Sequence, residues 1–81
     1  MPVPPAELAV HYTVAGPAAA QDAARDAAAP SGIAHEAGPG EMLLAGSREQ
    51  VLATLLDVVA AALDASAHRI DVRVEAPTGS R

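Results

Sequence analysis

Three histidines carry most of the side-chain chemistry that this sequence offers near neutral pH, since imidazole can bind ligands or transfer protons. His11 lies in a segment of alternating apolar and polar residues, where a spacing of two places Thr13 beside it on one face of a strand. An imidazole next to a hydroxyl can hydrogen-bond a small polar ligand. The same pair also fits a solvent-exposed or interface position, and both interpretations stay open at this point.

His35 and Glu36 are adjacent in a second, shorter segment, where strand alternation groups His35 with Ile33. The two polar side chains could contact a ligand or lie at an exposed sheet edge. His68 directly follows a helical pattern, where a histidine interacts favourably with the helix dipole. We therefore interpret His68 as a helix-end residue rather than a ligand contact.

Gly38 and Gly40 enclose Pro39 and form the densest turn signal of the chain. Glycine tolerates positive φ and allows a ligand to approach the backbone closely, so both glycines are candidate binding positions; an ordinary β-hairpin turn is the alternative. The lysine and the Ser/Thr of a phosphate-binding loop are missing. Glu36 and Glu41 flank the turn, and we interpret them as solvated edge charges rather than a catalytic carboxylate pair.

Composition excludes several kinds of site and partner. The chain has no cysteine, which removes disulfides, thiolate ligands and thiolate nucleophiles. The three histidines form no local ligand pair, so we expect no metal site. A net charge of −5 argues against nucleic acid as a partner. No run of about 18 apolar residues predicts a membrane span, and no signal-peptide pattern opens the sequence, so we expect a cytoplasmic protein.

Alternation with a period of two predicts strands over residues 7–14 and 69–75, and shorter strands are expected over 33–37 and 41–45. An alanine-rich helix is predicted over 18–29, and Ser47 with Gln50 forms a capping box ahead of a second helix. The buried face of the first helix is expected to consist of Ala20, Ala23, Ala24 and Ala27. The second helix is expected to supply most of the core through Val51, Leu52, Leu55, Leu56, Val58, Val59 and Leu63.

This order of elements predicts an α+β fold: a ferredoxin-like βαββαβ sandwich, with a four-stranded antiparallel sheet and two helices on one face. We expect one domain over residues 7–76, an irregular segment over 1–6 and a flexible tail over 77–81. The core is poor in large side chains, with one tyrosine and no phenylalanine or tryptophan. Small domains with such cores often oligomerise, so we expect at least a dimer.

Several motifs together point to a family. They are the first strand over residues 8–14, the turn Gly38-Pro39-Gly40, Gly46 after the third strand, Val51-Leu52 in the second helix, and residues 67–72 entering the last strand. In this pattern, which covers residues 7–75, the chain resembles the small thiamine-binding family, related to the YkoF proteins that bind thiamine or its hydroxymethylpyrimidine moiety. Gly40, Glu41 and Met42 stand where that family's turn usually has an aromatic residue and a threonine.

The resemblance implies a non-catalytic protein that binds a small ligand, such as the cation thiamine, near oligomer-facing sheet surfaces. It also implies a homodimer or homotetramer formed through the open sheet face. We expect no cofactor, and the candidate ligand-binding residues are His11, Thr13, His35, Glu36, Gly38 and Gly40. Two other hypotheses stay open. The chain could be a structural or regulatory oligomerisation module without a ligand. Alternatively, it could be a small tautomerase with Pro2 as base, although further residues separate this proline from the first strand.

Overall fold

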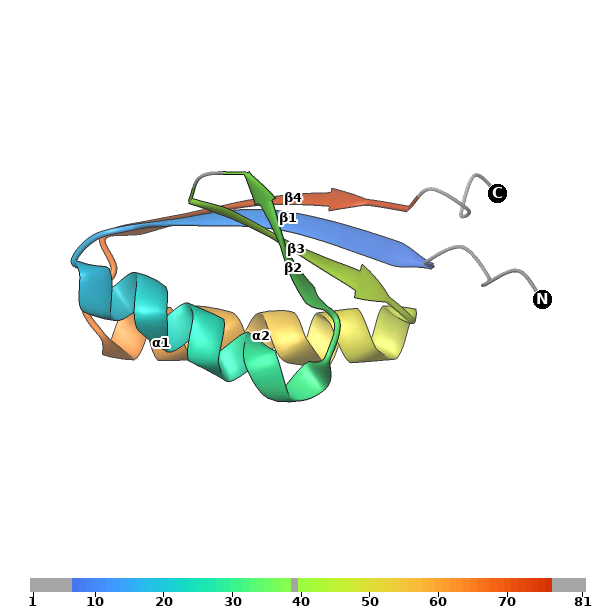
Figure 1. Ribbon diagram of the computed structural model, residues 1–81, viewed down its shortest axis with the longest axis horizontal. Helices are drawn as coiled ribbons and strands as arrows, with labels where there is room; N and C mark the ends of the chain where they lie inside the picture. Colours follow the sequence, from blue (N-terminus) through green and yellow to red (C-terminus); the bar gives the residue numbers. More distant parts are fainter. Residues whose placement is uncertain (1–6, 39, 77–81) are drawn as a thin grey trace.

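The computed structural model describes residues 7–38 and 40–76, which form two layers (Figure 1). The elements follow in the order β1 (Leu8–Ala15), α1 (Ala18–Ala28), the short 3₁₀ turn η1 (Ala29–Ser31), β2 (Ala34–Gly38), β3 (Glu41–Gly46), α2 (Arg48–Asp64) and β4 (Arg69–Glu75). The predicted ferredoxin-like α+β fold is confirmed. The segments 1–6 and 77–81, with Pro2 and Pro39, lie outside the described residues.

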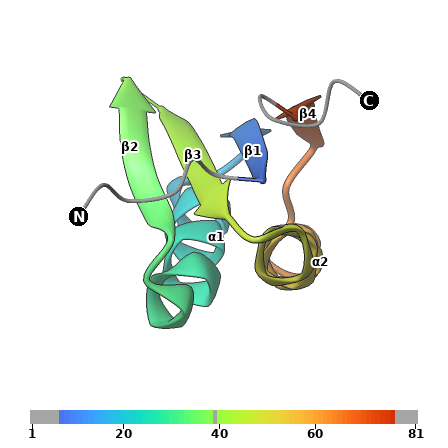
Figure 2. The same ribbon diagram turned by 90° about the vertical axis from the view of Figure 1, so that its right-hand side faces the viewer.

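The four strands form one antiparallel sheet in the order β2-β3-β1-β4. In the middle of the sheet Val10 pairs with Leu44 on β3 and with Val74 on β4. Because side chains alternate along a strand, these residues and Tyr12 all point to the helix layer. His11 and Thr13 therefore point to the opposite, open face. In end view, α1 lies beneath β2 and β3, and α2 lies on the side of β1 and β4 (Figure 2).

Small side chains bring the helices close to the sheet and to each other. Ala20, Ala24 and Ala28 of α1 are buried, and Ala23 and Ala27 are half-buried. The predicted alanine face of the first helix is therefore confirmed. Alanine contributes little apolar area but allows a close helix–sheet approach, so the large buried side chains come from the sheet and from α2. The largest fully buried ones are Tyr12, Leu44, Val10, Val51 and Val58.

The second helix begins as predicted but buries less of its apolar stripe than the sequence indicates. The Ser47 hydroxyl accepts a hydrogen bond from the Gln50 backbone N–H at 3.2 Å. Val51 and Val58 are buried. The expectation that the whole stripe enters the core is wrong for Leu52, Leu56 and Leu63, which are exposed. α1 flanks one side of α2, whereas no described element covers the side that carries these leucines.

One local detail also differs from the sequence expectations. Strand β2 begins at Ala34, and Ile33 ahead of it is buried in the core, whereas His35 pairs with Leu43 and shares the open face. Grouping His35 with Ile33 was therefore wrong, because alternation holds only inside the strand.

Gly16 between β1 and α1 has φ +150, and a Cβ there would lie 3.1 Å from the Ala67 Cα atom. The close passage of these two backbones requires glycine.

Replacing Leu44 by alanine is expected to lower the free energy of unfolding by about 2–5 kcal/mol, because Leu44 is fully buried at the sheet centre. The matched control is Leu43→Ala, one residue away on the open face, where the side chain is half-buried. Urea denaturation of both variants measures the difference. Equal losses for the two variants would contradict the assignment of the core to the helix side of the sheet.

Candidate functional site

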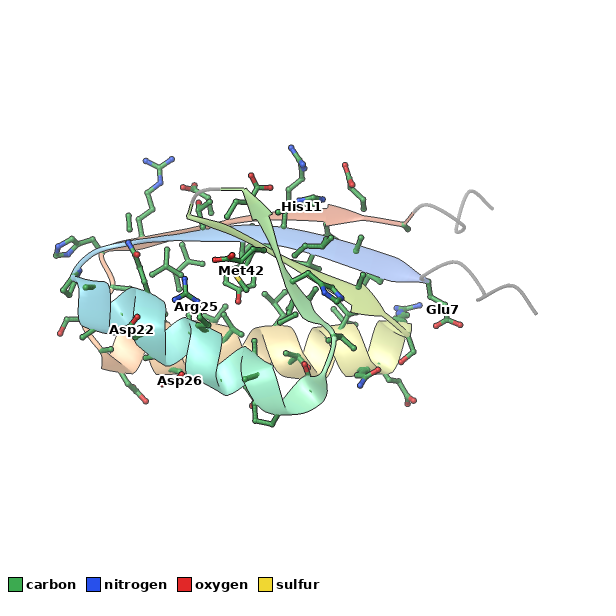
Figure 3. All side chains as sticks on the ribbon, viewed as in Figure 1. Glu7, His11, Asp22, Arg25, Asp26 and Met42 are labelled. Atoms are coloured by element: carbon green, nitrogen blue, oxygen red, sulfur yellow. The ribbon has the colours of Figure 1, made fainter. Side chains whose placement is uncertain are left out.

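The open face of the sheet collects most of the polar side chains that could act together. His11 and Thr13 lie on β1, in register with Leu43 and Glu41 on β3. On the other side of β1 the open-face row of β4 consists of Arg69, Asp71, Arg73 and Glu75. Figure 3 shows His11 on the side of the sheet that faces away from the helices. This face therefore combines an imidazole, a hydroxyl, carboxylates and guanidinium groups.

Two carboxylates flank the His11 ring. Its Nδ1 atom lies 2.8 Å from Glu41 Oε2, and its Nε2 atom lies 3.6 Å from Glu75 Oε1. The register explains both contacts: Thr13 pairs with Glu41 and Ala9 pairs with Glu75, so each glutamate is a diagonal neighbour of His11. The histidine side chain is only 22% exposed. Its ring is therefore held between two acidic groups at the surface of the sheet.

An open hollow of about 240 Å³ lies next to this histidine. It is lined by His11, Tyr12, Thr13, Glu41, Asp71, Val72 and Arg73. Tyr12 and Val72 point to the helix side, so they offer only main-chain atoms to the hollow. The charged lining consists of two carboxylates, from Glu41 and Asp71, and the guanidinium of Arg73. Arg69 lies 3.0 Å from Asp71, and Glu75 lies 3.6 Å from Arg73, so around the hollow three carboxylates face two guanidinium groups.

The residues singled out from the sequence separate into three places. His11 and Thr13 line the hollow. His35 is exposed in the same row of the open face, separated from His11 by Leu43. The other residues belong to the hairpin end of the sheet: Glu36 on the helix side, paired with Met42, and Gly38 and Gly40, the last with φ +74.

Sequence reasoning missed Glu41, Asp71 and Arg73 as members of this group. Asp71 and Arg73 are polar positions of the last predicted strand, and their spacing of two and four residues from Glu75 places all three on one face. Nothing local to the sequence, however, brings β1 next to β4. The sequence predicts Glu36 and Glu41 as solvated edge charges that flank the turn. An irregular register between Glu36 and Gly38 pairs Glu36 with Met42 and Gly38 with Glu41. Glu36 instead lies 3.9 Å from Arg25 on α1.

On the helix side, Tyr12 is buried and its hydroxyl has no hydrogen-bond partner. A second cavity of about 20 Å³ adjoins it, with Gln21, Arg25 and Glu36 among its lining residues. This volume is about what one water molecule needs. Burial raises the pKa of Tyr12 above its ordinary value of 10.0, and the nearby positive charge of Arg25 partly opposes that shift. The cavity is therefore a hydration site at most, not a ligand pocket.

Within residues 7–38 and 40–76, no three His, Asp or Glu side chains are arranged so that they could hold a metal ion. Among the same residues, neither helix is long and apolar enough to cross a membrane. The open-face hollow is thus the feature of the described chain with the most concentrated chemistry.

Comparison with known proteins supports the fold and leaves the ligand open. No protein-family model and no curated protein matches the chain. Among solved structures, the chain resembles the structure of a domain of unknown function, DUF77, from Bacillus cereus. The TM-score is 0.66 and the sequence identity 20%, over 84% of this chain and 71% of that chain. At this identity the likeness shows the ferredoxin-like fold alone, so membership of the thiamine-binding family stays a prediction.

Tyr12 is the only tyrosine of the chain, and tryptophan is absent, so the ultraviolet absorbance of the phenolate reports on this one residue. We expect the midpoint of its titration to be higher in the folded protein than in the urea-denatured chain. Above about pH 10 the unfolded chain loses the tyrosine proton first, so the free energy of unfolding should fall as pH rises through the folded pKa. Equal midpoints in the folded and denatured chains would contradict the burial of the hydroxyl.

The matched variant is Tyr12→Phe. It removes a buried hydroxyl without a partner, so we expect stability at neutral pH to stay equal or to increase slightly. Denaturation curves at neutral and alkaline pH should show that the variant lacks the alkaline loss of stability. A large loss at neutral pH would instead mean that the hydroxyl has a strong hydrogen bond.

Proposed function

We propose that this protein is a non-catalytic binder of a small, positively charged or amino-substituted ring compound, which it holds in the hollow on the open sheet face. The observation that carries the proposal is the acidic cluster around His11, where Glu41 and Asp71 line the hollow and Glu75 lies beside it. Carboxylates at the rim of a hollow attract a cation and accept hydrogen bonds from amino groups.

The position of His11 favours binding over acid–base catalysis. Both of its ring nitrogens face carboxylates, at 2.8 and 3.6 Å. A general base needs a free nitrogen within reach of the proton that it removes from the substrate. The hydrogen bond between His11 Nδ1 and Glu41 instead orients that carboxylate, and because a neutral imidazole has one N–H, its contribution to a binding site is to hold this one acceptor in place.

The hollow limits the size and the mode of recognition of the ligand. Pockets for drug-sized molecules usually enclose about 300–1,000 Å³. The hollow of about 240 Å³ is smaller and open, and suits one ring with its substituents. The aromatic ring of Tyr12 lies in the core, so it offers no stacking surface there. Affinity then depends on charge and hydrogen bonds, and should fall as ionic strength rises.

The sequence resemblance to thiamine-binding proteins supplies a concrete ligand class that fits these limits. Thiamine combines a cationic ring with an aminopyrimidine. Hydroxymethylpyrimidine contains the aminopyrimidine without the cationic ring. The amino group of the pyrimidine would donate to the Glu41 or Asp71 carboxylate, and the cationic ring would lie near the same acidic cluster. The likeness to the DUF77 domain supports the scaffold of this proposal and not its ligand.

A thermal-shift titration with thiamine and with hydroxymethylpyrimidine tests the proposal. A ligand that binds only the folded chain raises the melting temperature with increasing concentration. We expect such a rise for the wild-type protein and a weaker effect at high salt. If neither compound raises the melting temperature, the thiamine-type ligand class is rejected for this site.

Two charge-neutralising variants locate the site. Glu41→Gln keeps the shape of the side chain but removes its charge beside His11, and we expect it to weaken binding of thiamine by roughly tenfold or more. The control is Glu36→Gln, which removes the same charge on the other face of the sheet and should leave the affinity unchanged. Isothermal titration calorimetry measures both. An equal loss in the two variants would point to a general charge effect and away from the hollow.

A further inference from the structure

The strand β4 is an edge strand: within the described residues it pairs with β1 on one side only. Its other side therefore carries a row of backbone N–H and C=O groups that can pair with a further strand. Proteins usually protect such an edge with charged side chains of one sign, a proline, a bulge, a short strand or a covering element, whereas the charges of β4 alternate in sign. β4 is seven residues long, contains no proline, and six of its residues are exposed.

The charges on this strand alternate in a self-complementary order. The open-face residues of β4 are Arg69, Asp71, Arg73 and Glu75, which read positive, negative, positive, negative. If a second β4 pairs antiparallel about a two-fold axis at Val72, Arg69 stands opposite the second copy's Glu75 and Asp71 opposite its Arg73. The same two pairs recur on the other side of the axis. Every charged residue of the strand then faces an opposite charge, which favours the pairing.

Neighbouring registers lose this complementarity. An axis at Asp71 places that residue opposite its own copy and Arg69 opposite the second copy's Arg73. An axis at Arg73 likewise places like charges opposite each other. Axes between residues would set an open-face residue opposite a helix-side one, which the alternation of side chains forbids. Axes at Ile70 or Val74 keep opposite charges but pair only Arg69 with Asp71 or only Arg73 with Glu75. The axis at Val72 is therefore the register that pairs all four charged residues of the strand with opposite charges.

The helix side of the same edge is apolar and uncovered. Val72 and Val74 of β4 are 42% and 53% exposed, and Leu52, Leu56 and Leu63 of α2 are 40%, 72% and 56% exposed. The helical spacing sets these leucines apart from the buried residues Thr54 and Val58, and their exposure shows that α1 does not cover them. α2 lies on the β4 side of the sheet (Figure 2), so its leucines and the β4 valines border the same edge.

We propose that the protein dimerises edge to edge, with β4 pairing antiparallel to β4 of a second copy about an axis at Val72. The two sheets then form one continuous eight-stranded sheet, and the leucine flanks of the two α2 helices face each other beneath it. On the helix side Val72 meets its own copy, and Ile70 meets the second copy's Val74. This assembly uses the sheet edge rather than the open face, so it needs no ligand to form, although Asp71 and Arg73 also line the hollow.

Charge reversals test the register. Arg73→Glu places two acidic residues opposite each other, and Asp71→Arg places two arginines opposite each other. We expect each single variant to raise the dimer dissociation constant by about tenfold or more, measured by sedimentation equilibrium. The two changes move the net charge in opposite directions, so a general charge effect cannot weaken both dimers. Both side chains are more than half exposed, so the monomer fold should persist, as circular dichroism can check.

Mixing the two single variants provides the decisive measurement. In a heterodimer of one Arg73→Glu chain with one Asp71→Arg chain, every charged pair in this register is again of opposite charge. The same holds for the homodimer of the double variant, which carries Arg73→Glu and Asp71→Arg in one chain. We expect native mass spectrometry to show the heterodimer in preference to either homodimer. Failure of both the mixture and the double variant to recover the dimer would overturn the proposal, as would a wild-type protein that is monomeric at every concentration tested.

Leu56→Glu separates this assembly from one that packs two open faces together. Leu56 lies on α2, on the far side of the sheet from His11, and is 72% exposed. An edge-to-edge dimer should dissociate more readily when this leucine becomes a glutamate, because two leucine flanks meet at the axis. A dimer whose dissociation constant does not change in Leu56→Glu would be formed by another surface, and the proposal would be wrong.

Discussion

The width of the helix layer is the constraint on which the rest of the structure depends. Ala20, Ala24 and Ala28 let α1 pack closely, and the buried residues of α2 are Val51, Thr54, Val58 and Ala62. Two helices packed through such small side chains form a narrow layer, while the sheet above them has four strands. The layer shields Val10, Tyr12 and Leu44 completely or nearly so, but it leaves Val72 and Val74 of β4 exposed. The exposed valines of β4 and leucines of α2 follow directly from this mismatch.

The two proposals use different consequences of this architecture and are compatible. A sheet with helices on one side has a second face, and in this chain that face carries the acidic cluster around His11. The edge is a separate surface, where peptide groups and apolar side chains are available. The β4 row takes part in both: Asp71 and Arg73 line the hollow, and they also face a second copy in the proposed register. A ligand in the hollow would therefore lie close to the dimer axis.

The sequence predicted the elements of the fold well, because alternation and helical spacing are local signals. Ser47, the alanine face of α1 and the open-face placement of His11 all follow from neighbours within a few residues. The apolar stripe of α2 was less informative about burial. Its periodicity groups Leu52, Leu56 and Leu63 on one flank, but it cannot tell which element covers that flank. The contacts of His11 with Glu41 and Glu75 depend on strand register between distant segments, which no local pattern of this chain encodes.

The position of β1 in the sheet also has a consequence for biosynthesis. β1 pairs with β3 and with β4, and both follow it along the chain. The ribosome thus makes this inner strand first, and its second neighbour exists only once Arg69–Glu75 has been translated. Until then β1 has an open edge in the nascent chain, and its closure waits for a pairing between distant segments, a kind of contact that forms slowly. A chaperone or protease acting during translation would meet this strand unpaired.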